Sequence, residues 1–277
     1  MKKISVLFLT AIMVISLVAC GSNDVKSSIE TTDLLGVWYD VKTAQRIEFN
    51  SDLSFGHYQT RTAPGNPGYW SIDNNKLNIK SCVTIEDLKI QDFDDSISLN
   101  DDIYTFVKWE SLPITELSVG EVAKDESVAI KLKDINFYDK LPNEILNSHT
   151  YSSSLSGLNS GNVYIKITFD VTNLLKSEIN VPGLRGDMDI IVDYDNGFRY
   201  ATYDNGSCFY ISDSDVYITE PGGARGYDIS VQPLQTRTFD VYIECPEIIS
   251  IDDDSPLNIC FISKYGTEAK YYSFSIR

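Results

Sequence analysis

The sequence has 277 residues, of which 40 are acidic and 23 basic, so its formal net charge at pH 7 is −17. An acidic surface of this kind repels the phosphates of nucleic acids, which excludes nucleic acid as a partner. A chain of this length forms one large domain or two ordinary ones, each able to bury a hydrophobic core.

The first residues have the pattern of a cleaved export signal. Lys2 and Lys3 precede an apolar stretch that runs from Ile4 to Ala19. As a helix this stretch would be about 24 Å long at about 1.5 Å per residue, which is short of the roughly 30 Å hydrocarbon core of a bilayer. A positive start followed by a short apolar segment predicts that residues 1–19 are a signal peptide rather than a permanent membrane span.

The apolar stretch ends in Leu17-Val18-Ala19-Cys20-Gly21, which resembles the lipobox of bacterial lipoprotein precursors. The resemblance implies that the chain is cut before Cys20 and that this thiol is acylated, with palmitate as an expected fatty acid. Two buried acyl chains give stable anchoring, so the membrane is an expected partner through the covalent lipid. The expected location is the extracytoplasmic face of the cell membrane. Residues 20–32 are polar and lack aromatic side chains, which predicts a flexible tether.

From residue 33 to residue 110 the sequence alternates apolar and polar residues in short runs separated by Asn, Asp and Gly. This pattern is typical of short antiparallel strands. The connections are mostly short, so the strands are expected to follow one another up and down and to close into a small barrel that hides their edges. The strands are expected at 36–41, 45–49, 53–60, 68–72, 76–80, 82–90, 96–99 and 103–109.

This region opens on Gly36-Val37-Trp38, continues with Gly68-Tyr69-Trp70-Ser71-Ile72 and ends in Tyr104-Thr105-Phe106-Val107-Lys108. In this order the pieces resemble the small lipocalin-like domains common in bacterial lipoproteins. A barrel of this size either encloses one small ligand or is filled by its own side chains, and both alternatives stay open. Trp38 and Trp70 are expected to fill the core rather than to stack on a ligand.

Ser111-Leu112-Pro113 interrupts the alternation, so residues 111–118 are expected to be a linker that proteases cut early between two independent domains. Further on, Tyr-Asp-Asn-Gly occurs at 194–197 and at 203–206. Asn-Gly suits two-residue hairpin turns, which predicts a three-stranded meander over 187–212. The strands are expected near 127–136, 161–173, 187–194, 198–203, 207–212, 226–232, 236–245, 256–264 and 270–276.

The second region opens on Val119-Gly120-Glu121, and its long central strand ends at Asn173. It continues with residues 193–200 and with residues 233–239. In this order the pieces resemble the immunoglobulin-like domain of unknown function found in Gram-positive lipoproteins and secreted immunogenic proteins. The resemblance implies a β-sandwich over 119–277 and an envelope location, but no activity. The expected fold class is all-β, a small lipocalin-like antiparallel barrel followed by an immunoglobulin-like β-sandwich.

An insertion from Tyr138 to Gly161 departs from the pattern of that family. Loops of this length inside a compact domain are usually functional or disordered. Tyr138, His149 and Tyr151 have the polar and aromatic character of recognition loops, so we expect them to form a binding loop. The alternative is a mobile insertion without a role.

Neither catalysis nor a metal site is predicted. There is no Gly-x-Ser-x-Gly, and the two histidines, His57 and His149, have the context of surface residues. The spacing of Cys82, Cys208, Cys245 and Cys260 matches no zinc site. Aspartates cluster at 92–95, 101–102 and 252–254, where calcium is an alternative to solvated turn carboxylates, but they lack the EF-hand spacing.

Strand alternation gives a prediction for two of the cysteines. In 236–245 it places Cys245 on the apolar face, whereas in 256–264 it places Cys260 opposite the apolar residues. Adjacent strands with that parity cannot bring the two sulfur atoms within bridging distance, so we expect no Cys245–Cys260 disulfide.

These observations favour a non-enzymatic, lipid-anchored protein of the cell envelope that presents β domains for binding an envelope partner. The alternative is a lipocalin-like carrier or sensor that holds a small hydrophobic ligand in the N-terminal barrel. A third possibility, an envelope hydrolase, would require a histidine and a carboxylate to converge in a cleft.

Overall fold

The computed structural model describes residues 31–58, 68–73, 76–81, 96–99, 104–146, 158–181, 187–202, 208–213, 215–220, 223–226 and 229–277. The expected signal peptide, Cys20 and nearly all of the tether lie outside these residues. So do His149, Tyr151 and the strand expected at 82–90.

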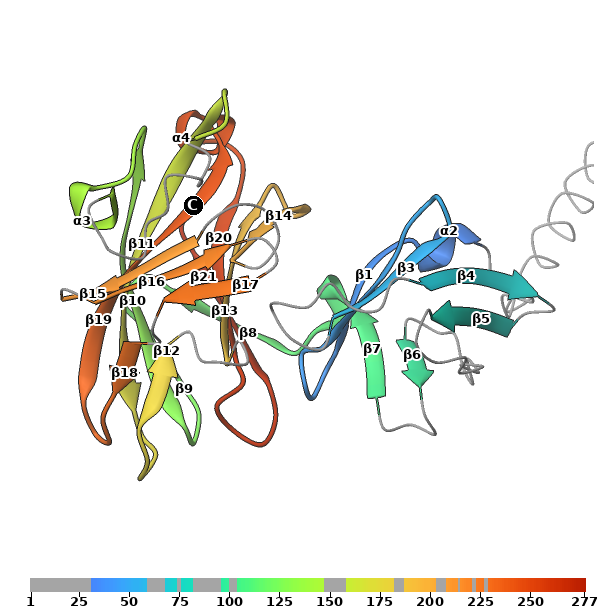
Figure 1. The fold of residues 1–277 in the computed structure, drawn as a ribbon, viewed down its shortest axis with the longest axis horizontal. Coiled ribbons are helices and arrows are strands. Elements are labelled where there is room, and N and C mark those ends of the chain that lie inside the picture. Colours follow the sequence, from blue (N-terminus) through green and yellow to red (C-terminus); the bar gives the residue numbers. More distant parts are fainter. Residues whose placement is uncertain are drawn as a thin grey trace, which may run out of the picture.

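The first domain is a single antiparallel sheet with the strand order β5-β4-β3-β2-β1-β7-β6 (Figure 1). The strands follow one another as expected, but in the described residues β5 and β6 are the two edges of an open sheet, and no pairing closes it. The expected closed barrel is therefore not shown, because β5 and β6 do not pair with each other. The elements are α2 (Thr31–Leu34), β1 (Gly36–Asp40), β2 (Arg46–Phe49), β3 (Ser54–Tyr58), β4 (Gly68–Asp73), β5 (Lys76–Ser81), β6 (Ser96–Leu99) and β7 (Tyr104–Lys108).

Large side chains of this sheet pack together into one buried cluster. Trp38 and Phe106 are each only 1% exposed, and Trp70 packs edge-on against Phe49 with 5.4 Å between ring centroids. Each indole N–H is hydrogen bonded inside the protein, since Trp38 donates to the Leu34 carbonyl at 2.8 Å and Trp70 to the Asn50 carbonyl at 3.2 Å. The prediction that Trp38 and Trp70 fill the core is confirmed.

The second domain is a β-sandwich. One sheet has the order β17-β16-β15-β19-β11-β10-β9, the other has the order β14-β13-β20-β21-β8, and β12 pairs with β18 beside them. The strands are β8 (Ile114–Ser118), β9 (Val122–Lys124), β10 (Val128–Tyr138), β11 (Asn162–Asn173), β12 (Ile179–Val181), β13 (Met188–Tyr194), β14 (Phe198–Ala201), β15 (Cys208–Ser212), β16 (Asp215–Glu220), β17 (Gly223–Gly226), β18 (Ile229–Val231), β19 (Thr236–Pro246), β20 (Leu257–Ser263) and β21 (Lys270–Ser275). The helices of this domain are α3 (Asn143–Leu146) and α4 (Ile248–Ile251), and η1 (Trp109–Ser111) lies between β7 of the first domain and β8.

The sandwich core follows from alternation along its longest strands. β11 and β19 pair along their whole lengths and send every second side chain inward. Phe169 of β11 meets Phe261 of β20, from the opposite sheet, with 5.0 Å between ring centroids. These contacts fix the two sheets face to face.

Two expectations about connectivity are wrong. Residues 114–118, expected within a linker, form β8, which pairs in parallel with β21 at the edge of the five-stranded sheet. The meander over 187–212 stops after β14, because β15 pairs with β16 and β19 in the other sheet. The first turn also has three residues rather than two, since Tyr194 pairs with Phe198 and both Asp195 and Asn196 take positive φ.

The five-stranded sheet is buried on both faces. One face packs on the sandwich core, and the other, with Ile191 and Ile262, packs on Trp109 and Tyr39 of the first region. This second contact explains why every residue of β13 is buried. The Tyr271 hydroxyl also donates to the Asp40 carbonyl at 3.0 Å across the junction. A shared hydrophobic cluster therefore joins the two domains, whereas the sequence predicted few contacts between them; their independence in unfolding and proteolysis stays a prediction.

Cys245 and Cys260 are both free and buried, so the absence of a bridge between them is confirmed. The side-chain alternation is also as predicted, with Cys245 in the sandwich core and Cys260 in the cluster between the domains. The two strands are not neighbours, however, since β19 and β20 belong to different sheets.

Candidate functional site at the junction of the two domains

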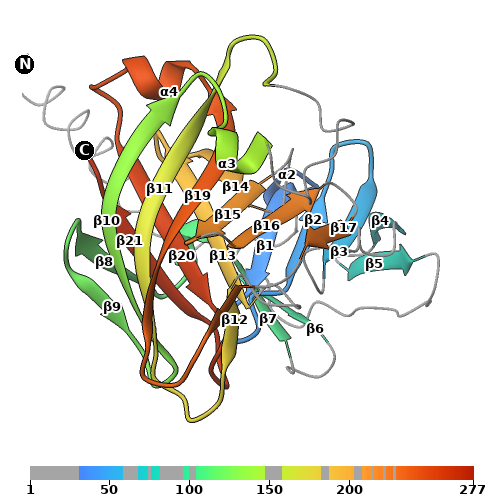
Figure 2. The same ribbon diagram turned by 60° about the vertical axis from the view of Figure 1, so that its left-hand side comes forward.

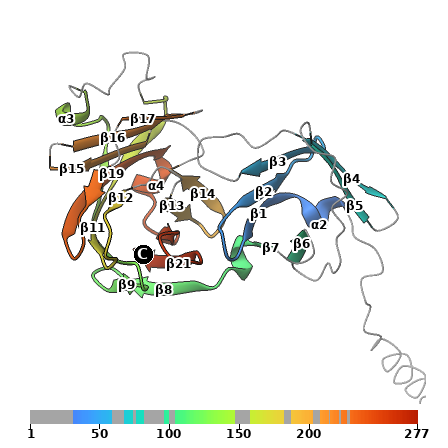
Figure 3. The same ribbon diagram turned by 60° about the horizontal axis from the view of Figure 1, so that its bottom comes forward.

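A cavity of about 640 Å³ lies where the first domain meets one edge of the sandwich. This edge is formed by β8 and β9, the last strands of the two facing sheets, which Figures 2 and 3 show at the same border of the molecule. A volume between 300 and 1,000 Å³ is usual for ligand pockets, and domain interfaces are a common place for them. The lining residues are Val41, Lys42, Pro113, Thr115, Leu117, Val122, Ala123, Lys124, Asp125, Glu126, Glu268, Ala269, Lys270, Tyr271 and Tyr272.

Two local features position the walls of this junction cavity. Gly120 has a φ of +92°, a conformation that favours glycine, and it lies in the turn that takes the chain from β8 in one sheet to β9 in the other. The Ala269 N–H donates to the Lys42 carbonyl at 2.6 Å, which ties the turn after β1 to the start of β21. The cavity is therefore bounded by both domains in a fixed arrangement.

Tyr271 and Tyr272 are buried and alternate between the two faces of β21. The Tyr271 hydroxyl is held by the Asp40 carbonyl, and the Tyr272 hydroxyl donates to Asp125 at 3.4 Å. Burial, followed by the nearby Asp40 carboxylate, raises the pKa of Tyr271 well above its usual value, and burial and the Asp125 carboxylate do the same for Tyr272. Both tyrosines stay neutral and present ring surface.

The charged side chains that line the junction cavity differ in whether they already have partners within the protein. Asp125 accepts the N–H groups of Ser127 and Val128 at 2.6 and 2.8 Å, and its other oxygen accepts the hydroxyls of Ser263 and Tyr272. Its carboxylate is therefore occupied by partners within the protein.

Among the lysines, Lys270 lies 3.8 Å from Glu268. Lys42 and Lys124 form no ion pair with any residue in the described part of the chain. The cavity thus carries two lysines that are free to pair with a ligand. Sequence reasoning missed this site, because its residues come from distant segments that share no motif.

A second cavity, of about 450 Å³, lies at the base of the insertion and includes Tyr138 in its lining. Tyr138 is 41% exposed, and its ring centroid is 6.2 Å from that of Tyr242. Of the three residues predicted for the binding loop, the structure places only Tyr138, since His149 and Tyr151 lie outside the described residues. The other lining residues are Lys140, Leu141, Pro142, Lys166, Ile211, Asp213, Asp240 and Tyr242.

The described part of the insertion is anchored to the sandwich. Leu141 and Ile145 are buried against Tyr164 and Tyr242. On the returning side, Asn159 donates its backbone and side-chain N–H groups to Glu244 at 3.0 and 2.7 Å. The signal for this anchoring is in the sequence, because Leu141 and Ile145 are four residues apart, the spacing that places two side chains on one face of a helical turn.

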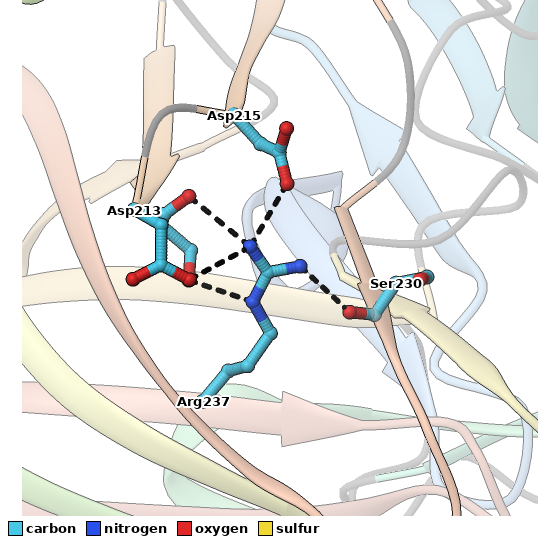
Figure 4. A network of polar contacts seen from close by, with 5 residues as sticks. Asp213, Asp215, Ser230 and Arg237 are labelled. Carbon is cyan, nitrogen blue, oxygen red and sulfur yellow. Dashed lines mark hydrogen bonds and ion pairs between the residues drawn. The ribbon is translucent and has the colours of Figure 1, made fainter.

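Arg237 of β19 holds the turn that forms one wall of this second cavity (Figure 4). Its guanidinium group lies 2.8 Å from Asp215 and 3.2 Å from Asp213, and it donates to the Ser230 carbonyl at 2.9 Å and to the Ser212 hydroxyl at 3.0 Å. One planar fork thereby joins β15, β16 and β18. Its role is to fix the turn rather than to bind a ligand.

Arg199 connects the two domains electrostatically. Its guanidinium carbon lies 5.0 Å from the centre of the Trp109 ring, and the group pairs with Glu110 at 2.9 Å and with Asp193 at 3.2 Å. Burial raises the pKa of Asp193, against the lowering effect of Arg199. The arginine therefore balances a partly buried carboxylate while it stacks on the tryptophan of the other domain.

Of the aspartates considered for calcium, Asp252 is engaged in hydrogen bonds within the protein. Asp252 accepts the Tyr194 hydroxyl and the N–H groups of Asp254 and Ser255, and hydrogen bonds from Ser255 and Tyr194 hold its pKa well below the usual range. Residues 92–95 and 101–102 lie outside the described residues. Within the described ranges, no three His, Cys, Asp or Glu side chains are grouped to hold a metal ion. Of the helices in the same ranges, none has the length and apolar character needed to cross a bilayer.

No protein-family model and no curated protein matches the chain. Part of the chain is similar to an uncharacterised β-sandwich protein from Clostridium difficile 630, with 24% identity over 61% of this chain and 99% of that one and a TM-score of 0.40. A conserved hypothetical protein from Bacillus anthracis has 12% identity over 58% of this chain and 94% of its own, with a TM-score of 0.33. YcdA from Bacillus subtilis, a candidate lipoprotein, has 12% identity over 57% of this chain and 39% of its own, with a TM-score of 0.29.

Proposed function

We propose that the protein is an exported lipoprotein, anchored through Cys20 at the extracytoplasmic face of the cell membrane, which presents a two-domain β module for non-enzymatic binding. The observation that carries the proposal is the sequence Leu17-Val18-Ala19-Cys20-Gly21 placed directly after a short apolar segment. The family assignments, lipocalin-like for the first domain and immunoglobulin-like for the second, are part of this proposal.

The structure supports a binding role in two ways. The two domains share a hydrophobic cluster, so their surfaces are held in one relative arrangement and do not belong to two independently moving domains. Its cavities lie at the domain junction and at the base of the insertion, which are places where ligands and partners commonly bind. The alternative of a hydrophobic carrier in the first domain has less support, because Trp38, Phe49 and Phe106 pack against one another in its buried cluster.

The anchoring is tested with Cys20→Ala in the native host, with Cys82→Ala as the matched control. The proposal expects incorporation of labelled palmitate and partition into the detergent phase for the unchanged protein and for the control. Cys20→Ala should lose both, because the acylated thiol is gone. Unchanged labelling and partition of the Cys20→Ala protein would refute the anchor.

The binding role is tested by replacing Tyr138 with a photo-crosslinking phenylalanine analogue in the anchored protein. The control position is Tyr69, an aromatic residue of the first domain that is 67% exposed. A partner that binds at the insertion should be crosslinked from position 138 and not from position 69. Equal crosslinking from both positions, or from neither, would contradict binding at this face.

A further inference from the structure

We infer that the second cavity, at the base of the insertion, binds a neutral sugar unit of a glycan. The inference deepens the proposed function and rests on it, because it names a ligand class for the face where binding is proposed. It does not depend on the lipid anchor. It is carried by an exposed aromatic ring, by a fixed pair of hydrogen-bonding side chains and by lining charges that cancel.

The cavity lies on the outer face of the seven-stranded sheet. Lys166 of β11 and Tyr242 of β19 both line it, and they are direct partners across the two strands. Their neighbours in sequence, Ile167 and Val241, belong to the sandwich core on the other face. On the outer face, Ile145 of α3 packs against Tyr242 (Figure 2). The paired central strands therefore hold the lining side chains in place beside the insertion, around a volume of about 450 Å³.

Tyr138 gives this cavity an exposed aromatic ring with a fixed neighbour. It is the last residue of β10 and is 41% exposed, and its ring lies against that of Tyr242, which is buried. One face of a sugar ring carries C–H groups, which pack on the electron-rich face of an aromatic side chain. A tyrosine has few side-chain torsions, so ordering it against a ligand costs little conformational entropy. The exposed ring therefore suits the face of a sugar.

Lys166 and Asp240 place a hydrogen-bond donor beside an acceptor in the cavity lining. The Lys166 Nζ lies 3.0 Å from one carboxylate oxygen of Asp240, and the other oxygen accepts the Thr168 hydroxyl at 2.7 Å. The Lys166 and Asp240 side chains are only partly buried. An ammonium group donates more than once and a carboxylate oxygen accepts more than once, so both can bond a ligand as well as each other. Adjacent sugar hydroxyls, which both donate and accept, match this pair.

The formal charges around the cavity cancel. Two lysines and two aspartates line it, namely Lys140, Lys166, Asp213 and Asp240. Beside Asp213, Arg237 and Asp215 add one charge of each sign, in the network of Figure 4. A charged ligand would be left unmatched or would have to displace a partner from an existing pair, whereas a neutral polar ligand leaves the pairs intact. The balance therefore favours an uncharged, hydroxyl-bearing ligand over an acid or an amine.

The test uses the methyl glycosides of four neutral sugars, glucose, galactose, mannose and N-acetylglucosamine, and those of glucuronic acid and glucosamine as charged comparisons. Saturation-transfer NMR is recorded on the purified full-length protein, in a detergent without a sugar head group. At least one neutral glycoside should bind, with the strongest transfer to its ring C–H protons, and the charged glycosides should bind more weakly. No transfer to any of the four neutral glycosides, or tighter binding of a charged one, would overturn the inference.

Substitutions of Tyr138 then test the stacking. Tyr138→Ala should weaken binding of the neutral glycoside about fivefold or more, because the ring is lost, and Tyr138→Phe should retain binding, because the ring is kept. Tyr69→Ala removes an exposed ring of the first domain and is the control that should change nothing. Thermal unfolding checks that each variant is folded. Equal binding by Tyr138→Ala and Tyr69→Ala would refute the stacking.

A second pair of variants tests the hydrogen bonds. Asp170 does not line the cavity but has the same kind of contacts as Asp240, since it lies 3.4 Å from Lys133 and accepts the Thr238 hydroxyl at 2.6 Å. Asp240→Asn should weaken binding of the neutral glycoside about two- to tenfold, the range for one hydrogen bond, and Asp170→Asn should not. Equal effects of the two substitutions would refute the site.

The photo-crosslinking experiment at position 138 separates this inference from the proposed function. Capture of a protein from position 138, with no glycoside bound in the NMR experiment, would overturn the inference and leave the binding role standing. Capture of nothing, again with no glycoside bound, would remove both. A glycan captured from position 138, together with binding of a neutral glycoside, is the result expected.

Discussion

Truncating Trp109 should uncouple the two domains. This residue is 5% exposed and belongs to the hydrophobic cluster between the five-stranded sheet and the first domain. Its ring packs edge-on against Tyr39 with 5.5 Å between centroids, and the Arg199 guanidinium lies 5.0 Å over it. In Trp109→Ala these contacts are lost and a cavity remains in the cluster.

The expected cost follows from the burial of this side chain. Replacing a buried tryptophan by alanine typically lowers the free energy of unfolding by about 3–5 kcal/mol. Natural domains are stable by about 5–15 kcal/mol, so the loss is a large fraction of the total. For a protein of this size, 1 kcal/mol corresponds to about 2–4 °C, which gives a fall in Tm of roughly 6–20 °C.

The assay is urea unfolding followed by far-ultraviolet circular dichroism, with limited proteolysis in parallel. The unchanged protein should unfold in one transition and resist cleavage at 111–118, because β8 is part of a sheet. Trp109→Ala should unfold in two transitions and be cut near the junction. Tyr69→Ala, which removes an exposed aromatic side chain, should behave like the unchanged protein. Two transitions in the unchanged protein would refute the coupling.

Two further predictions concern buried residues of the sandwich. Cys245 and Cys260 should resist alkylation at pH 8 until the protein unfolds, because burial raises the pKa of both thiols to about 12; rapid alkylation of either thiol in the folded protein would contradict this. Ile145→Ala should lower the free energy of unfolding by about 2–5 kcal/mol in chemical denaturation, since Ile145 is fully buried, and an unchanged midpoint would mean that the insertion is not anchored.

Because the insertion is anchored, replacing it by a short linker should destabilise the sandwich. Closing a loop of different length alters stability by only about 0.6 kcal/mol per doubling, so a shorter linker alone would have a small effect. Replacing residues 141–158 removes Leu141 and Ile145 as well, and exposes Tyr164 and Tyr242. The sequence could show the length of the insertion, but the partners of its two apolar residues are in distant strands.

Local periodicity was sufficient to predict the long strands. The expected strand 161–173 corresponds to β11, and 236–245 corresponds to β19, because along much of each strand buried residues alternate with partly buried ones. Pairing between strands was harder to predict. β8 joins β21 in parallel from the other end of the domain, and no local pattern in Ile114–Ser118 indicates that partner.

The sequence does contain a sign of the packing between the domains, but a search for alternating apolar and polar residues overlooks it. Ile190-Ile191-Val192 in β13 is a continuous apolar run, as is Ile259-Cys260-Phe261-Ile262 in β20. Such runs are typical of strands that are buried on both faces. A sandwich strand needs only one apolar face, so a strand that is apolar on both faces must be covered by a second layer of protein. Here the first domain and the segment after it supply that layer through Tyr39, Trp109 and Leu112.

This second layer determines the geometry of the junction cavity. Lys42 and Lys124 lie on different domains, so their separation is set by the packing between the domains and not by either sheet alone. A preformed site avoids the free energy of ordering that a ligand must otherwise supply. Trp109 does not line the cavity, yet Trp109→Ala should loosen its walls, because the packing that holds the first domain against β21 would be lost. The Ala269 N–H, which donates to the Lys42 carbonyl across the junction, should then exchange faster with solvent deuterium. Unchanged exchange of this amide in Trp109→Ala would show that the junction cavity keeps its shape without the tryptophan.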